Sequence, residues 1–292
     1  MTTTERLPAR ARAAREGTAR IRESAGRAAV YTLLGAAVVT VAFPVYYAFA
    51  GAVMGPSELS SYPPALLPHS VTGRNFAGAV EVIPLGRQYL NSAVTAGLIT
   101  LAQLLTSILA AYAFVFLPLR WRAAVFGVFL ATLMVPWEAV IIPNYLMLSG
   151  WGLGNTYFGL VLPFLASGFG TFMLRQSFRQ FPAELRDAAR IDGAGHWRFL
   201  WRILVPLNKP SLAAIAIYVF LSAWNQYFWP LIITRTAQMQ TLQIGLASLR
   251  DAERADPGLI LAGVVLSLLP TLVLVVFGQR FVVRGLTAGA VR

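Results

Sequence analysis

The stretch 181–210, FPAELRDAARIDGAGHWRFLWRILVPLNKP, is a polar interruption between long apolar segments. Between residues 184 and 192 it carries three acidic side chains and two arginines. Only 12% of the whole chain is charged and 57% is hydrophobic, whereas a soluble domain is about 25% charged. A block with so many charges in such an apolar chain indicates a water-exposed loop of a polytopic membrane protein.

Six apolar segments are long enough to cross a bilayer, since a spanning helix takes about 20 mostly apolar residues. They cover about 28–50, 89–117, 123–148, 157–176, 211–233 and 258–280. We therefore predict an all-α fold, a polytopic membrane protein of six transmembrane helices. Residues 28–88 would hold the first helix and an extracytoplasmic loop. Pro and Gly between 51 and 88 favour irregular structure in that loop.

The Lys and Arg residues predict the orientation. If the N-terminus lies inside, 19 of the 24 fall in inner segments and 5 in outer ones, as the positive-inside rule requires. Both termini and 181–210 are therefore expected in the cytoplasm. The basic tail 1–27 is expected to be disordered or to lie on the anionic lipids of the membrane. The net charge of +12 is thus attributed to topology, and no nucleic-acid partner is predicted.

The sequence also limits the chemistry. It contains no Cys and two His, His69 and His196, so neither a thiolate nor a histidine-rich metal site is expected. No G-x-x-x-x-G-K-[ST] phosphate loop is present, so the chain is not expected to bind ATP or any other cofactor itself. The apolar segments lack the convergent acids and nucleophiles of a membrane-embedded enzyme.

The first half of the polar stretch predicts a short helix over 182–192. Pro182 suits the first turn of a helix, and Gly193 suits the left-handed residue that ends one. One helical face would carry Leu185, Ala188, Ala189 and Asp192, and another Arg186 and Arg190. Such a short helix is not stable alone in water, so a partner or its own flanks must hold it.

The second half predicts another helix over 196–205, after a joint at 193–195. Its apolar stripe consists of Trp197, Leu200, Trp201 and Leu204. Arginines beside that stripe are typical of a helix at the membrane interface. Pro206 and Pro210 are expected to end it before the next span.

The spacing within this stretch resembles the EAA motif of the membrane subunits of bacterial binding-protein-dependent ABC importers. The family pattern is Glu-Ala-Ala, three residues, Gly, nine residues, Ile, one residue, Leu-Pro. Here Asp187-Ala188-Ala189 is followed at the same spacing by Gly193, Ile203 and Val205-Pro206. Asp replaces Glu and Val replaces Leu. The alternative, a solvated loop whose charges only keep it inside, does not explain this spacing.

The resemblance extends over 89–292, which looks like the permease core of the carbohydrate branch, the maltose and glycerol-3-phosphate type permeases. It is carried by LMVP at 133–136, AWNQYFWP at 223–230 and GLTAGAV at 285–291. VPWE at 135–138 and WNQY at 224–227 are most similar to the glycerol-3-phosphate members.

The resemblance implies a non-catalytic permease subunit in a bacterial plasma membrane, for sugars or related polyols. The implied partners are a second homologous permease, two ATP-binding subunits that use ATP and Mg, and an extracytoplasmic solute-binding protein. The ATPase would dock on the 181–210 loop, a cytoplasmic coupling helix. The implied docking residues are Glu184, Asp187, Ala188, Ala189, Asp192, Gly193 and Ala194.

Polar residues at membrane depth are candidates for the solute pathway. Glu138 and Asn225 would lie at similar depths if the third and fifth spans are continuous helices. Further candidates are Trp224, Gln226, Tyr227 and Gln103. Aromatic rings and amides suit sugar hydroxyls, but hydrogen bonding between helices is an equal alternative for the polar ones. No Lys or Arg lies in the spans away from their ends to neutralise a phosphate, which favours a neutral sugar or a mixed specificity.

Two other classes of transporter remain open from the residues. A secondary transporter would need ion-coupling residues and internal repeats, whereas Glu138 is the one acid at membrane depth and no clear repeat is visible. An ABC permease for a non-carbohydrate solute such as an amino acid would share the same loop, and substrate binding to the partner binding protein would separate the two.

Overall fold

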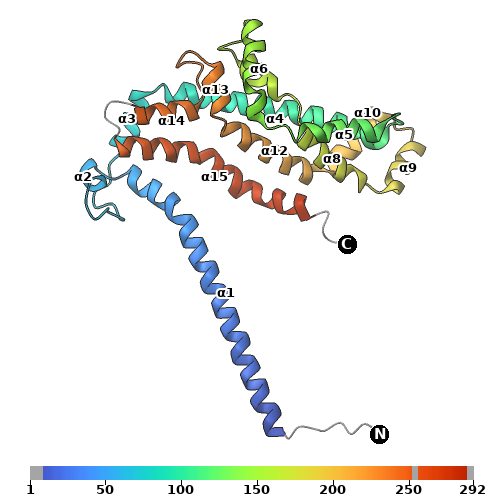
Figure 1. Cartoon of the computed structure of the whole chain (residues 1–292). Helices are drawn as coiled ribbons and strands as arrows, with labels where there is room; N and C mark the ends of the chain where they lie inside the picture. The colour runs from blue at the N-terminus through green and yellow to red at the C-terminus, as the bar shows by residue number, and fades with distance from the viewer. Residues whose placement is uncertain (1–8, 252–255, 288–292) are drawn as a thin grey trace.

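The computed structural model describes residues 9–251 and 256–287, which form helices and loops without a β-strand (Figure 1). Three segments are long and apolar enough to span a membrane. They are 26–52 within α1 (Ala9–Ala52), α4 (Leu85–Phe116), and 257–279 within α15 (Pro257–Thr287). Three bent pairs of helices raise the candidate spans in the described part to as many as six. The all-α polytopic class is therefore confirmed.

The bent pairs correct the expected span boundaries. The pair α5 (Arg122–Thr132) and α6 (Trp137–Gly150) bends by 91°. The segment formed by α7 (Tyr157–Val161) and η1 (Leu162–Phe164) bends by 48° into α8 (Gly168–Arg179). A third bend, of 78°, precedes α12 (Lys209–Trp224), and α13 (Phe228–Ile233) is a separate short helix. The prediction of single continuous helices over 123–148, 157–176 and 211–233 is therefore wrong.

Four helices form the packed body. The helix α4 lies against α8 and α12, and α12 lies against α15 (Figure 1). Ile99 of α4, Leu174 of α8 and Val219 of α12 are buried in the core that these helices share. The helix α6 projects from this body in Figure 1, because the bend after α5 turns it away.

The first helix touches the body only near its C-terminal end. Ala48 and Ala52 pack against Ala262 and Val265 of α15, while apolar residues earlier in α1 are exposed, as expected of a lipid-facing surface. Residues 9–27 continue this helix, so the predicted disorder of the tail is wrong for them. Residues 1–8 of the tail lie outside the described residues.

The segment between α1 and α4 contains more structure than its Pro and Gly content indicates. It forms α2 (Pro56–Leu59) and α3 (Arg74–Val82). Asn75 of α3 is buried and donates from Nδ2 to the carbonyls of Ala52 at 3.0 Å and Met54 at 2.8 Å. These bonds satisfy carbonyls at the end of α1. A further helix, α14 (Leu242–Asp251), packs against α4 and α15.

Candidate docking element and solute pathway

The predicted docking helix is α9 (Ala183–Ile191), and its ends follow from its sequence. Pro182 is the N-cap, Glu184 lies in the first turn and Arg190 in the last, so both charges complement the helix dipole. Gly193 has φ +71°, and the Ala194 amide donates to the Ala189 carbonyl at 2.9 Å. The prediction that Gly193 ends the helix in a left-handed conformation is confirmed.

The faces of α9 differ from the predicted ones. Ala189 is 6% exposed, so it packs against the body of this chain and not on a docking face. Ala194 is half-buried beside it. Five of the candidate docking residues are exposed, namely Glu184, Asp187, Ala188, Asp192 and Gly193. The implied docking role places Ala189 on an outward face, whereas in the structure its small side chain is buried and lets α9 pack close to the body.

The segment after the joint is helical but irregular. It begins as α10 (His196–Phe199), widens into the π-helix η2 (Leu200–Leu204) and ends as α11 (Val205–Leu207). Pro206 therefore does not end it, and the chain bends after Leu207 instead. The predicted apolar stripe divides into buried and exposed members. Leu200 and Leu204 are 2% and 0% exposed, while Trp197 and Trp201 are 66% and 39% exposed.

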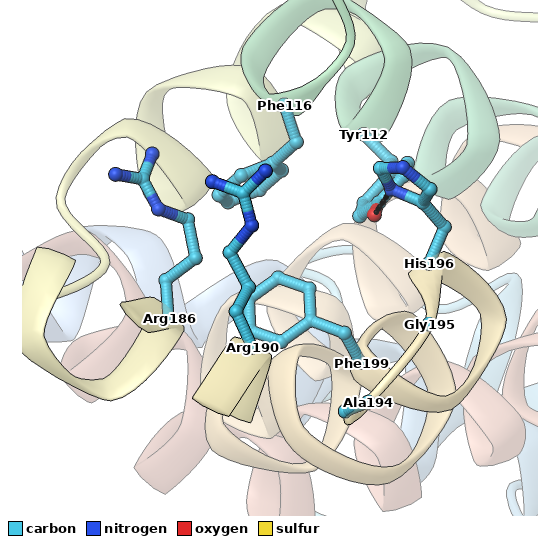
Figure 2. Close-up of a pocket in the computed structure, with 8 residues that line it drawn as sticks. All are labelled: Tyr112, Phe116, Arg186, Arg190, Ala194, Gly195, His196 and Phe199. Atoms are coloured by element: carbon cyan, nitrogen blue, oxygen red, sulfur yellow. Dashed lines mark hydrogen bonds between the residues drawn. The ribbon is translucent and has the colours of Figure 1, made fainter. Parts of the chain in front are cut away.

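A half-open pocket lies between the docking helix and α4. Figure 2 shows the guanidinium groups of Arg186 and Arg190 on one side of it and Tyr112 with His196 on the other. The Tyr112 hydroxyl lies 2.7 Å from Nδ1 of His196, which ties the joint to α4. Arg186 also pairs with Asp187, with Nε to Oδ1 at 3.2 Å. The predicted common face of the two arginines is confirmed, and that face turns toward the body.

The amide candidate in α4 has a structural bond. Gln103 donates from Nε2 to the Phe164 carbonyl at 2.8 Å, and Thr106 donates from Oγ1 to the Leu165 carbonyl at 3.0 Å. Both carbonyls precede the bend between η1 and α8, where the backbone lacks its normal helical partners. Gln103 and Thr106 therefore hold a broken helix in place.

Three chain breaks meet at an aromatic cluster that the sequence did not reveal. Trp137 follows the first break, Phe164 precedes the second and Trp229 follows the break after α12. The Trp137 ring centroid lies 4.6 Å from that of Phe164 and 5.9 Å from that of Trp229. Trp229 also donates from Nε1 to the Gly159 carbonyl at 3.1 Å. Broken helices at membrane depth are tolerated where they line a cavity or are buried in protein.

The remaining pathway candidates have different environments. Trp224 is 2% exposed and donates to the Ser267 carbonyl at 3.3 Å, so it belongs to the core. Asn225 is exposed at the C-cap of α12, and Tyr227 is half-buried. The buried Oε1 atom of Gln226 has no hydrogen-bond partner within the described residues. A buried amide oxygen without a partner is costly, so the hydrogen-bonding capacity of Gln226 is not fully used by the described residues.

Glu138 lies in the first turn of α6 and is exposed. Its depth had been estimated by counting residues along a straight helix from 123, and that estimate is wrong because of the 91° bend between α5 and α6. Sequence reasoning also missed Gln243 of α14. Its Nε2 lies 3.4 Å from Oδ1 of Asn225, which links α14 to the end of α12.

The chain is similar to known permeases over most of its length. A protein from Agrobacterium fabrum named sn-glycerol-3-phosphate transport system permease protein UgpE is 37% identical over 269 residues, covering 89% of this chain and 95% of that protein. Proteins of the same name from Yersinia pestis and Brucella abortus are 38% and 37% identical, each covering 85% of this chain and 92% of the relative.

The fold is also similar to that of a chain in a solved transporter. A chain of a bacterial ABC transporter involved in the import of the acidic polysaccharide alginate superposes with a TM-score of 0.79 at 22% identity, covering 89% of this chain and 97% of that one. The family model described as binding-protein-dependent transport system inner membrane component matches residues 103–287. The protein therefore belongs to the family of inner membrane components of binding-protein-dependent ABC transport systems.

Proposed function

We propose that this chain is the permease subunit of an ATP-driven importer for sugars or related polyols, with glycerol 3-phosphate as the first solute to test. The observation that carries this proposal is the 37–38% identity to glycerol-3-phosphate permeases over 85–89% of the chain. The chain forms half of the translocation pore and a second homologous permease forms the other half.

The docking face supports a role without catalysis. A helix of nine residues leaves Leu185 48% and Ile191 87% exposed, and carries Glu184 and Asp187 at the surface. A partner that covers the apolar side chains and pairs with the acids would stabilise this short helix. That partner is an ATP-binding subunit, of which the complex has two. ATP and Mg bind to those subunits, and no cofactor binds to this chain.

The distribution of charge supports the proposed orientation. The docking element and both termini lie in the cytoplasm of a bacterium, and the loop with α2 and α3 lies outside, where an extracytoplasmic solute-binding protein delivers the solute. The arginine excess of the inner segments follows from this placement.

The solute pathway is proposed to follow the broken helices. The aromatic cluster joins three breaks, and Gln226 offers a buried amide oxygen that this chain does not satisfy. Glu138 and Asn225 are exposed next to two of the breaks. Aromatic faces and amides bind polyol hydroxyls. The cation for a phosphate group would come from the second permease.

The test is uptake by the complete transporter reconstituted in vesicles, with glycerol 3-phosphate compared with a neutral polyol. Import should require ATP and the ATPase subunits. Import without the ATPase would refute the proposal and favour a secondary transporter. If the complex imported amino acids in an ATP-dependent way but imported neither sugars nor polyols, the proposed substrate class would be overturned. The family assignment would still stand.

A charge variant probes the pathway itself. Glu138→Gln removes a negative charge and should lower the KM for glycerol 3-phosphate while leaving that for the neutral polyol unchanged. Glu81→Gln, at an exposed position of α3, is the matched control and should change neither. Equal effects of the two variants would exclude Glu138 from the pathway.

A further inference from the structure

Three arginines gather at one end of the α5–α8 pair. Arg122 is the first residue of α5, Arg179 is the last of α8, and Arg175 lies one turn before Arg179. Arg122 and Arg179 are both close enough to Arg175 to repel its charge. The ion pair between Arg186 and Asp187 involves none of the three, and within the described part of the chain none of them has an acidic partner.

The central arginine is held by aromatic rings. Its guanidinium carbon lies 4.0 Å from the centroid of the Phe126 ring, a cation–π contact. Phe126 in turn stacks on Phe172 with an interplanar angle of 18°. The Nε atom of Arg175 is buried and has no hydrogen-bond partner among the described residues. The side chain is therefore fixed in place while part of its hydrogen-bonding capacity stays unused.

The surroundings of this cluster favour a lipid. Trp121, next to Arg122, is 72% exposed, and tryptophan is enriched at the headgroup level of a membrane. Val125 and Val128 on the same helix are 46% and 66% exposed, which offers an apolar surface to an acyl chain. The cluster also lies at the end of the bundle assigned to the cytoplasm, where anionic lipids concentrate.

We propose that Arg122, Arg175 and Arg179 bind the phosphate group of an anionic phospholipid of the inner leaflet. A phosphodiester offers several acceptor oxygens to guanidinium donors and relieves the repulsion among the three cations. The acyl chains lie along α5. The arginines at the docking pocket are not part of this site, since one of them already pairs with Asp187. The site rests on this chain's own geometry and does not depend on the identity of the transported solute.

The test measures lipid retention by the purified transporter complex. The complex is placed in nanodiscs of phosphatidylglycerol and phosphatidylcholine and then released for native mass spectrometry. Arg175→Gln and Arg179→Gln should each reduce the retained phosphatidylglycerol about fivefold, from the interaction of one arginine with an anionic surface. Arg179 is exposed, so its variant preserves the packing on Phe126. Arg198→Gln, an exposed arginine of α10 outside the cluster, is the control and should retain the wild-type amount.

Three results would overturn the proposal. The first is equal phosphatidylglycerol retention by the wild type and both cluster variants. The second is complete displacement of the lipid by inorganic phosphate, which would show a site for a free anion. The third is loss of ATPase co-purification in the cluster variants with unchanged lipid retention, which would assign the arginines to a protein interface.

Discussion

Substituting serine for Gly193 tests whether the docking helix depends on its left-handed end. A Cβ at Gly193 would meet nothing within 4 Å, so the cost comes from the backbone alone. At φ +71° that cost is about 1–2 kcal/mol for an ordinary L-residue. Since α9 has nine residues and is marginal by itself, the ordered docking helix should fall about 5–30-fold in population relative to the frayed one.

The assay compares Gly193→Ser with Gly195→Ser in the reconstituted transporter. Gly195 has φ −68° and ψ 169° as the N-cap of α10, and a Cβ there also meets nothing within 4 Å. Serine is favoured at such a position, so this variant should transport normally. Gly193→Ser should lose most ATP-dependent uptake and show faster amide exchange in α9, with membrane insertion intact. Gly193→Asn should recover part of the activity, because asparagine tolerates this conformation.

The reasoning would be refuted if the two serine variants transported equally well. It would also be refuted if Gly193→Ser lost uptake with unchanged amide exchange in α9, because the strain would then not have reached the helix. Gly193→Asp, which adds a charge to the exposed joint as well as strain, should abolish transport while ATPase co-purification is lost.

Three further predictions concern other parts of the chain. Asp187→Lys should lower ATPase co-purification with little change in Tm, since an exposed ion pair contributes about 0–1 kcal/mol. Unchanged co-purification would indicate that this loop is only a solvent-exposed surface without a docking role. Gln103→Leu should cost about 1–3 kcal/mol of stability by leaving the Phe164 carbonyl unpaired, and a changed KM with normal Tm would point instead to solute contact. The pKa of Glu58 is lowered by hydrogen bonds from the Ser70 hydroxyl and the His69 amide. The stabilisation from these bonds is therefore fully present above the ordinary carboxyl pKa, and it is lost as the pH falls through the lowered pKa of Glu58. The difference in amide exchange at Ser70 between wild type and Glu58→Gln should vanish over that acidic window, and a difference that persists below it would contradict the assignment.

Hydropathy predicted the helices that are continuous, and the charge pattern predicted the polar stretch that contains α9, the proposed docking helix. The apolar runs placed both ends of α4 and the start of α15 within a few residues of their observed positions, because an uninterrupted apolar helix satisfies its backbone within itself. The helix α15 continues to Thr287, beyond the expected end at 280. The end of α9 was predictable for a similar reason, since the conformation of Gly193 is set locally by the absence of a side chain.

The breaks could not be predicted because prolines alone do not determine them. Pro44, Pro143 and Pro270 lie inside helices, whereas Pro136 lies at the 91° break. At the break between η1 and α8, distant side chains satisfy the freed carbonyls, as Gln103 does for Phe164, 61 residues away in sequence. The position of Ala189 was missed for a related reason. The sequence pattern shows which residues share a face, but the direction of that face depends on the buried residues against which the helix packs.

The π-helix η2 determines the rotation of the preceding residues about the helix axis relative to the following ones. Because Leu200–Leu204 contains a wider turn than an α-helix, the residues before it are offset about the helix axis relative to the residues after it. Removing one residue from this segment would restore regular turns and rotate everything upstream by about 100° while shifting it about 1.5 Å. The acids of α9 would then face another direction although every one of them is still present. The number of residues in the wide turn of η2 thus determines the direction in which the proposed docking helix faces.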